Sequence, residues 1–215
     1  MKNLLVTGTD TDVGKTWFML KFGELLIKNN IKFHFLKPVE SGCKESNNMI
    51  IPKDAVRLAK LEKISLKKVC KYMFRAYASP PKAAKMENKN IKLTNIIKFI
   101  EKNKIQEKNT FNIVEGCGGF FSPIANNKLT SDLAKELNFP IIIVVKNTLG
   151  CINHTLLTVK AILSLELKIK FIILNNTSKK IILDNYDELS KFTKIPIFRL
   201  GYNKKLDSNL IKYLT

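Results

Sequence analysis

The N-terminal stretch constrains the fold more than any other part of the chain, because an apolar run leads directly into a glycine-rich loop and then into a helix-forming segment. Residues 3–7 form the apolar run, and residues 8–16 read GTDTDVGKT, which fits the pattern G-x-x-x-x-G-K-[ST]. In such a loop the backbone N–H groups cradle phosphates, the lysine reaches the β and γ phosphates, and the final hydroxyl can bind Mg²⁺. The sequence therefore predicts a site for a nucleoside triphosphate that includes Lys15 and Thr16.

Further apolar runs alternate with helix-forming stretches. The runs are continuous, which is typical of parallel strands covered on both faces. The expected strands are residues 3–7, 31–36, 111–114, 141–145 and 171–174, and the expected helices are residues 15–29, 54–61, 93–102, 131–137, 153–165 and 181–192. We therefore expect an α/β fold: a three-layer P-loop NTPase-type fold with a mainly parallel central sheet flanked by helices, residues 1–215 forming a single domain.

Two local features refine this expectation. Ser131 or Thr130 is expected to cap the helix at residues 131–137. Residues 63–109, which are rich in lysine and contain a Pro-Pro pair, are expected to form short helices and loops over one side of the sheet. In folds of this class, ligands bind at the carboxyl ends of the strands, so the candidate site residues are sought there.

Composition and charge narrow the class of protein. At 215 residues and 45% hydrophobic content, the chain can bury a core without disulfide or metal crosslinks. Lysine and arginine together number 37 against 18 acidic residues, which gives a net charge of +19. Only Arg57, Arg75 and Arg199 are arginines, whereas base and phosphate recognition favours the guanidinium group. We interpret the charge as solvated lysine faces, and a basic nucleic-acid-binding protein is the less favoured alternative.

The cysteines and the terminal residues bear on the cellular compartment. Cys43, Cys70, Cys117 and Cys151 stand far apart and form no Cys-x-x-Cys pair, so neither a zinc site nor a disulfide framework is expected. The first apolar stretch is shorter than the core of a signal peptide, and no run approaches the roughly 18 residues of a membrane span. We expect a cytoplasmic protein with neither nucleic-acid nor membrane partners.

Two charged residues follow other expected strands. Glu115 comes after the run at residues 111–114 and precedes a glycine-rich segment. A carboxylate there can hold Mg²⁺ opposite Thr16, and the glycines allow a ligand to approach the backbone; the alternative is a solvated loop glutamate. Lys37 follows the run at residues 31–36 and either points into the same crevice or is one more surface lysine.

Several segments together resemble the dethiobiotin synthetase family. They are TGTDTDVGKT at residues 7–16, KPVESG at residues 37–42, Asp54, EGCGG at residues 115–119 and LGCINH at residues 149–154. The resemblance implies an ATP-dependent carboxylase of biotin biosynthesis with Mg²⁺ as cofactor. Such an enzyme closes the ureido ring of dethiobiotin from 7,8-diaminononanoate and CO₂, and ATP is converted to ADP and phosphate.

The resemblance also implies catalytic roles for the matching residues. Lys15 would hold the phosphates, and Lys37 would stabilise the carbamate and the phosphorylated intermediate. Thr11 and Ser41 would contact the diamine or its carbamate. The metal would be bound, directly or through water, by Thr16, Asp54 and Glu115; the role of Asp54 comes from the resemblance alone.

The nucleotide would contact a larger set of residues. These are Asp12, Val13, Gly14, Lys15, Thr16, Asp54, Glu115, Gly116, Cys117, Gly118, Asn175 and Asn176, with no role at position 17, which is Trp17. Asn175 matches the asparagine that contacts adenine in the family, whereas Asn176 stands where aspartate is common. The C-terminal stretch at residues 201–204 also departs from the family pattern, so the nucleobase preference stays open.

The segment at residues 149–154 would anchor the distant carboxylate of the substrate. Leu149, Gly150, Cys151 and Asn153 match this anchor, and the start of the helix expected at residues 153–165, which Asn153 can cap, offers N–H groups to an anion. In the family this loop completes the active site of the neighbouring subunit, which implies a homodimer. Tyr186 resembles a tyrosine near the substrate tail.

Two other NTPase classes share the expected fold. A partitioning or septum-site ATPase would carry a second lysine early in the phosphate loop, where residues 9–13 read TDTDV. A metallochaperone GTPase would carry an Asn-Lys-x-Asp motif after a late strand, where residues 146–149 read KNTL. Both classes stay as alternatives to the synthetase.

Overall fold

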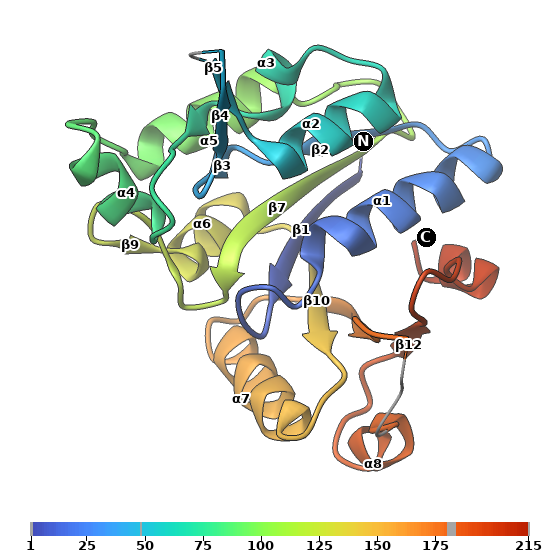
Figure 1. The fold of residues 1–215 in the computed structure, drawn as a ribbon. Coiled ribbons are helices and arrows are strands. Elements are labelled where there is room, and N and C mark those ends of the chain that lie inside the picture. Colours follow the sequence, from blue (N-terminus) through green and yellow to red (C-terminus); the bar gives the residue numbers. More distant parts are fainter. Residues whose placement is uncertain (1, 48, 180–183, 215) are drawn as a thin grey trace.

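The centre of the computed structural model is a six-stranded parallel sheet with the order β12-β11-β10-β1-β7-β2 (Figure 1). The structure describes residues 2–47, 49–179 and 184–214. The strands are β1 (Lys2–Gly8), β2 (Phe33–Leu36), β7 (Phe111–Gly119), β10 (Ile141–Lys146), β11 (Ile169–Asn175) and β12 (Ile197–Leu200). The expected α/β class with a mainly parallel sheet is confirmed.

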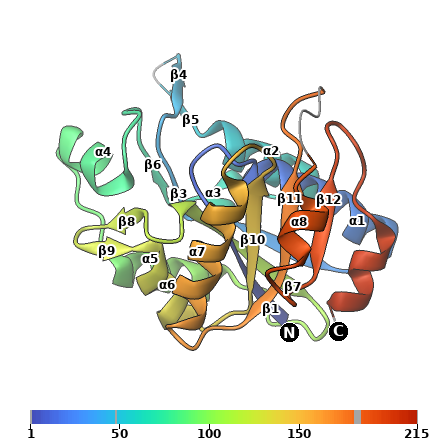
Figure 2. The same ribbon diagram turned by 90° about the horizontal axis from the view of Figure 1, so that it is seen from below.

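Helices cover both faces of this sheet (Figures 1 and 2). One apolar core lies under α1 (Lys15–Lys28), α2 (Lys53–Glu62), α3 (Leu66–Val69) and the 3₁₀ helix η1 (Ser208–Tyr213). The other lies under α4 (Pro80–Met86), α5 (Leu93–Asn103), α6 (Thr130–Leu137) and α7 (Cys151–Leu163). Neighbouring strand residues such as Leu4 and Leu5 enter different cores, which is why the strands read as continuous apolar runs.

Short elements fill the connections. Helix α8 (Tyr186–Ser190) packs beside β12. Three small two-stranded sheets pair β3 (Val39–Glu40) with β6 (Tyr72–Met73), β4 (Lys44–Ser46) with β5 (Met49–Ile51), and β8 (Pro123–Ala125) with β9 (Lys128–Leu129). Sequence reasoning did not find these strands, nor β12, because runs of two to four residues are too short to show a period. In the described part of the chain, no helix has the length and apolarity needed to cross a bilayer.

Three expected boundaries need correction. Strand β7 continues to Gly119, so Glu115 lies inside a strand and does not follow one. Helix α7 begins at Cys151 with Gly150 at its N-cap, so Asn153 lies in the first turn and does not cap the helix. Helix α8 is shorter than the helix expected at residues 181–192, of which residues 181–183 lie outside the described part of the chain.

The expected cap of α6 is also wrong. The N-cap is Leu129, and its backbone N–H donates to Asp132 Oδ2 at 2.7 Å. Thr130 is already helical, and its hydroxyl lies 3.0 Å from the carbonyl oxygen of Cys117. The cap therefore comes from the third helical residue, while Thr130 fastens the helix to β7.

The edge strand β2 is covered by a side chain from α2. Glu62, at the end of α2, accepts the backbone N–H of Phe35 at 2.9 Å, and its other carboxylate oxygen lies 2.6 Å from His34 Nδ1. His34 is 2% exposed. A strand edge normally leaves such N–H groups open, so Glu62 satisfies backbone that the sheet does not.

We expect Glu62→Ala to lower the free energy of unfolding by about 2 kcal/mol, because the Phe35 N–H and the His34 ring would lose a buried acceptor. The control is Glu24→Ala, which removes an exposed ion pair with Lys21 and should change stability by less than about 0.5 kcal/mol. Urea unfolding followed by circular dichroism measures both. Equal losses would mean that Glu62 acts only as a surface charge.

Candidate active site

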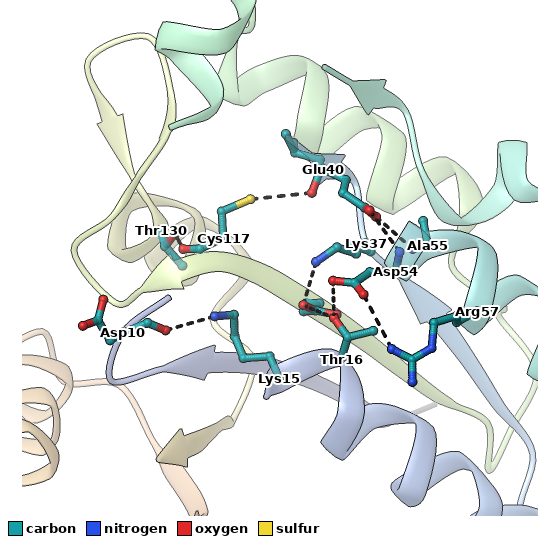
Figure 3. Close-up of polar contacts among 12 residues, drawn as sticks. Asp10, Lys15, Thr16, Lys37, Glu40, Asp54, Ala55, Arg57, Cys117 and Thr130 are labelled. Carbon is teal, nitrogen blue, oxygen red and sulfur yellow. Dashed lines mark hydrogen bonds and ion pairs between the residues drawn. The ribbon is translucent and has the colours of Figure 1, made fainter. Parts of the chain in front are cut away.

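A cavity of about 900 Å³ opens at the carboxyl ends of β1 and β7. Its walls come from the phosphate loop, the start of α2, the segments at residues 37–42 and 77–80, and the end of β7. These segments are distant in sequence and meet because the parallel strands end at one edge of the sheet. Figure 3 shows the polar contacts at the centre of this cavity.

The phosphate loop has a conformation that depends on a glycine. Gly14 has φ of 91° and serves as the N-cap of α1. A Cβ atom at this position would lie 2.2 Å from Asn175 Nδ2, so both the backbone angle and the space require glycine. Asp12 also has a positive φ, which aspartate tolerates better than most residues. Val13 lies between them and is buried.

Lys15 is the first residue of α1, and its side chain folds back across the loop. Its Nζ donates to the carbonyl oxygen of Asp10 at 3.2 Å, and the residue is only 7% exposed (Figure 3). Burial lowers the pKa of Lys15, and the positive charge of Lys37 adds to this effect, whereas Glu115 opposes it. A negatively charged ligand in the cavity would pair with this buried ammonium and stabilise its positive charge.

Oxygen atoms from three elements converge next to Lys15. The hydroxyl of Thr16, in α1, lies 3.1 Å from Asp54 Oδ2, in α2, and 2.9 and 3.0 Å from the two carboxylate oxygens of Glu115, in β7. Glu115 is 1% exposed, which excludes the solvated loop glutamate. Glu115 is in regular register with Val6 of β1, and the pairing of the two strands becomes irregular only after this pair, between Val6 and Gly8.

Lys37 lies inside the cavity rather than on the surface. Its Nζ is 2.7 Å from Glu115 Oε1, and the residue is 7% exposed. Burial acts to lower the pKa of Lys37, but the attraction of Glu115 and other nearby negative groups outweighs it, so the net pKa is raised. Lys37 therefore stays protonated and places a second buried cation opposite Lys15.

The remaining expected cavity residues form the rim and floor. Ser41 and Thr11 line the cavity, and Thr11 is exposed. Gly116, Cys117 and Gly118 line it from β7, and burial raises the pKa of the Cys117 thiol to about 11, so the thiol stays neutral.

Sequence reasoning missed Glu40, Arg57 and Tyr77. Arg57 Nη1 lies 3.8 Å from Asp54 Oδ1, and the Tyr77 hydroxyl lies 3.4 Å from Asp12 Oδ2. The carboxylate of Glu40 accepts the backbone N–H groups of Asp54 at 3.0 Å and Ala55 at 2.8 Å. Burial raises the pKa of Glu40, whereas Lys37 and these two bonds oppose the shift. The sequence held one hint of the role of Glu40. Pro52, which precedes α2, has no side chain able to cap a helix, so the cap has to come from another part of the chain.

Asn175 and Asn176 lie behind the phosphate loop rather than in the cavity. Asn175 Nδ2 donates to the carbonyl oxygen of Val13 at 2.8 Å. Asn175 Oδ1 is buried and has no hydrogen-bond partner among the described residues. Asn176 Oδ1 accepts from Asn147 Nδ2 at 2.8 Å. Asn175 therefore links the phosphate loop to the end of β11, and its Oδ1 atom is a buried acceptor without a donor among the described residues.

The expected anchor for the substrate tail does not reach the cavity of its own chain. Leu149 is 83% exposed, Gly150 has open space around it, and Asn153 is exposed on α7, whereas Cys151 is buried. Tyr186 lies under the guanidinium of Arg199, 3.8 Å from the ring centroid. The structure keeps all five of these residues apart from the lining of the cavity.

Comparison with known proteins indicates the family to which the chain belongs. A family model described as an AAA domain matches residues 2–208. Proteins named ATP-dependent dethiobiotin synthetase BioD from Vesicomyosocius okutanii and Clostridium kluyveri are each 34% identical; the matches cover 100% and 98% of this chain and 97% and 90% of those proteins. A third, from Ruthia magnifica, is 35% identical over 92% of this chain and 90% of its own length.

Solved structures with a similar fold are distant in sequence. The MinC:MinD cell division complex of Aquifex aeolicus aligns with a TM-score of 0.54 at 14% identity, over 100% of this chain and 85% of that one. A ParA family ATPase of Chlorobium tepidum aligns with a TM-score of 0.53 at 17% identity, over 99% of this chain and 88% of that one. At such identity the likeness extends to the fold alone.

We expect Gly14→Ala to destabilise the protein more than Gly150→Ala. Both glycines have a positive φ, of 91° and 85°, so both substitutions carry a backbone strain of about 1–2 kcal/mol. At Gly14 the new methyl group meets the side chain of Asn175, whereas no described residue other than the chain neighbours lies within 4 Å at Gly150. Urea unfolding of the two variants compares them directly, and equal losses would contradict the close packing of the loop against β11.

Proposed function

The chain belongs to the dethiobiotin synthetase family, and from this premise we propose that its cavity forms the ureido ring of dethiobiotin. The protein is an ATP-dependent ligase. The proposed substrates are 7,8-diaminononanoate, CO₂ and ATP, and the products are dethiobiotin, ADP and phosphate. The observation that carries the proposal is the pair of buried lysines, Lys15 and Lys37, that face one cavity beside Glu115.

The chemistry explains why two buried cations are needed. One amine of the substrate adds to CO₂ and loses a proton, which gives a carbamate. A carbamate oxygen then attacks the γ phosphorus and releases ADP; the second amine attacks the carbamoyl carbon, loses a proton and expels phosphate. Negative charge builds up beside an anionic nucleotide at each step, so fixed positive charge is the main resource. We assign the phosphates to Lys15, and the carbamate and the mixed anhydride to Lys37, with Thr11 and Ser41 next to the diamine.

The oxygen atoms beside Lys15 fit Mg²⁺. Within the described residues there is no cluster of three or more His, Cys, Asp or Glu side chains suited to a metal. Mg²⁺ needs no such cluster, because it is usually held by one or two carboxylates together with substrate phosphates and water. We propose that Thr16, Asp54 and Glu115 would hold it directly or through water. When bound, the ion would neutralise charge on the phosphates.

A buried acceptor supports adenine as the base. Asn175 Oδ1 has no partner among the described residues and sits beside the phosphate loop. The exocyclic amino group of adenine is a donor that would satisfy it, whereas guanine carries an oxygen at the same ring position. We therefore propose that adenine binds on the β11 side of the phosphate loop, outside the cavity described above, where Asn175, with Asn176 next to it, would contact the base once its Oδ1 atom is uncovered.

We also propose a homodimer. Leu149 and Leu157, at the start and on the outer side of α7, are 83% and 58% exposed. Among the described residues, and apart from its own chain neighbours, no atom lies within 4 Å of the position of a Cβ on Gly150, which leaves room for a second chain at this helix start. A partner that covered these leucines would bring Leu149, Gly150, Cys151 and Asn153 toward the diamine of the neighbouring site; Tyr186 would lie near the substrate tail.

Other features of the structure bear on the cellular location, the domain organisation and the partners of the protein. All four cysteines are free thiols, which supports a reducing, cytoplasmic location. The two apolar cores flank one sheet, which supports a single domain over residues 1–215. We propose small molecules and a second copy of the chain as its partners, without nucleic acid or membrane.

We expect the purified protein to form dethiobiotin from the diamine, bicarbonate, ATP and Mg²⁺, measured by mass spectrometry. The family relationship does not favour a partitioning ATPase or a metallochaperone GTPase. Either of these would hydrolyse its nucleotide without forming a cyclic urea. Nucleotide hydrolysis without dethiobiotin would therefore overturn the proposed function.

We expect Lys37→Met to lower the rate of product formation by at least about a hundredfold, because it removes one fixed charge from the transition state. Binding of an ATP analogue, measured by calorimetry, should weaken less than about tenfold, since Lys15 and the loop stay in place. The control is Lys60→Ala, an exposed lysine of α2. Equal losses of binding and turnover in the Lys37 variant would make Lys37 a nucleotide ligand only.

A further inference from the structure

Helix α2, which carries Asp54 into the cavity, has no cap of its own. Its N-cap is Pro52, whose side chain accepts no hydrogen bond. The N–H groups of Asp54 and Ala55 instead donate to the two carboxylate oxygens of Glu40, a residue 14 positions before Asp54. One carboxylate thus satisfies two of the free N–H groups that every helix leaves at its start.

This cap connects two parts of the site. Glu40 is the last residue of β3, three positions after Lys37, and it is 8% exposed. Asp54 is in contact on both sides: its N–H donates to Glu40, and its Oδ2 atom lies 3.1 Å from the Thr16 hydroxyl oxygen, which also lies against Glu115. The short segment that delivers Lys37 therefore also sets where α2 begins.

A buried carboxylate at position 40 carries an energetic cost, which suggests that its two hydrogen bonds to α2 serve a purpose. A buried carboxylate loses its hydration, and a negative charge near Lys37 opposes the binding of an anionic nucleotide. A serine at position 52 would cap α2 locally without that charge. What a local cap does not provide is a connection from α2 to β3, which the Glu40 carboxylate makes.

We infer that Glu40 is a positioning residue: by capping α2 from β3, it holds the Asp54 carboxylate against Thr16 and so sets the affinity of the site for Mg²⁺ with nucleotide. The inference rests on the proposed function in one respect, namely that Asp54 meets the metal. It concerns the binding of Mg²⁺ and nucleotide rather than the chemistry on the diamine.

The first variant is Glu40→Ala. Without the cap, the first turn of α2 frays and Asp54 is no longer held beside Thr16. The Mg²⁺ concentration for half-maximal product formation should rise about tenfold, which is the usual effect of losing a residue that supports a metal ligand. The rate at saturating Mg²⁺ and the KM for the diamine should stay within about twofold. A residue that only stabilises the fold would lower the melting temperature without moving the Mg²⁺ dependence.

The second variant restores a cap by another route. Pro52 has φ of −75° and ψ of 96°, an extended conformation that suits a serine N-cap. In the double variant Glu40→Ala with Pro52→Ser, the serine hydroxyl can accept from the first turn of α2, but the negative charge of Glu40 is not restored. Because the serine restores the first turn of α2 but not its connection to β3, the lost Mg²⁺ affinity should be recovered in part; full recovery would mean that the connection is not needed and would overturn the inference. No recovery would mean that Glu40 acts through its charge, which would overturn the inference.

The matched control is Glu45→Ala. Glu45 lies in the next strand, β4, is 44% exposed and pairs with Arg75 outside the cavity. Glu45→Ala removes the same charge as Glu40→Ala from the same stretch of chain. Because Glu45 lies outside the cavity, the Mg²⁺ dependence of product formation should be unchanged. An equal shift in both variants would contradict a specific role for Glu40.

Two further readouts do not depend on product formation. Hydrogen exchange of the Asp54 and Ala55 amides in the metal-free protein should be at least about tenfold faster in Glu40→Ala than in the wild type. Binding of ADP, measured by calorimetry with and without Mg²⁺, should lose its enhancement by the metal in that variant. If the wild type makes no dethiobiotin, the proposed function fails while these two measurements still decide the inference; unchanged exchange and unchanged metal enhancement would overturn it.

Discussion

The site depends on one buried carboxylate, that of Glu115. It lies in β7, the strand next to the edge strand β2, almost without exposure, and it contacts Lys37 and Thr16. A buried charge is stable only when it is paired and hydrogen-bonded, so Lys37 and the hydroxyl of Thr16 hold Glu115 as much as Glu115 holds them. Glu115 pairs in regular register with Val6 of β1, two residues before Gly8 at the start of the phosphate loop.

The balance of charge around Glu115 leaves the cavity ready for an anion. Lys15 is buried with a lowered pKa, and its Nζ contacts a backbone carbonyl oxygen. The protonated Lys37 is paired with Glu115, and the carboxylate of Glu40 accepts N–H groups at the start of α2. A triphosphate that enters the cavity would therefore meet a desolvated ammonium in a preformed loop, and little reorganisation would be needed before reaction.

Several junctions of the surrounding fold are held by side chains that are distant in the sequence. Glu62 serves the edge of β2 from α2, Glu40 serves the start of α2 from β3, and Thr130 fastens α6 to β7. Each of these side chains joins an element that lines the cavity, α2 or β7, to a neighbouring element. In a chain with so many surface lysines, the buried carboxylates do most of this joining, because acidic groups accept the N–H bonds that strands and helices leave open.

The sequence by itself determined the parts that depend on local pattern. The continuous apolar runs placed five of the six strands of the main sheet, and the spacing of Gly8, Gly14, Lys15 and Thr16 located the phosphate loop, because a loop of this kind needs these residue types at these positions. Only the tertiary structure decided that β7 continues past Glu115, that α7 starts before Asn153, and that Glu40 caps α2 from 14 residues away. Those outcomes depend on which side chains the folded sheet brings together, and a carboxylate in the sequence carries no mark of the distant N–H group that it will accept.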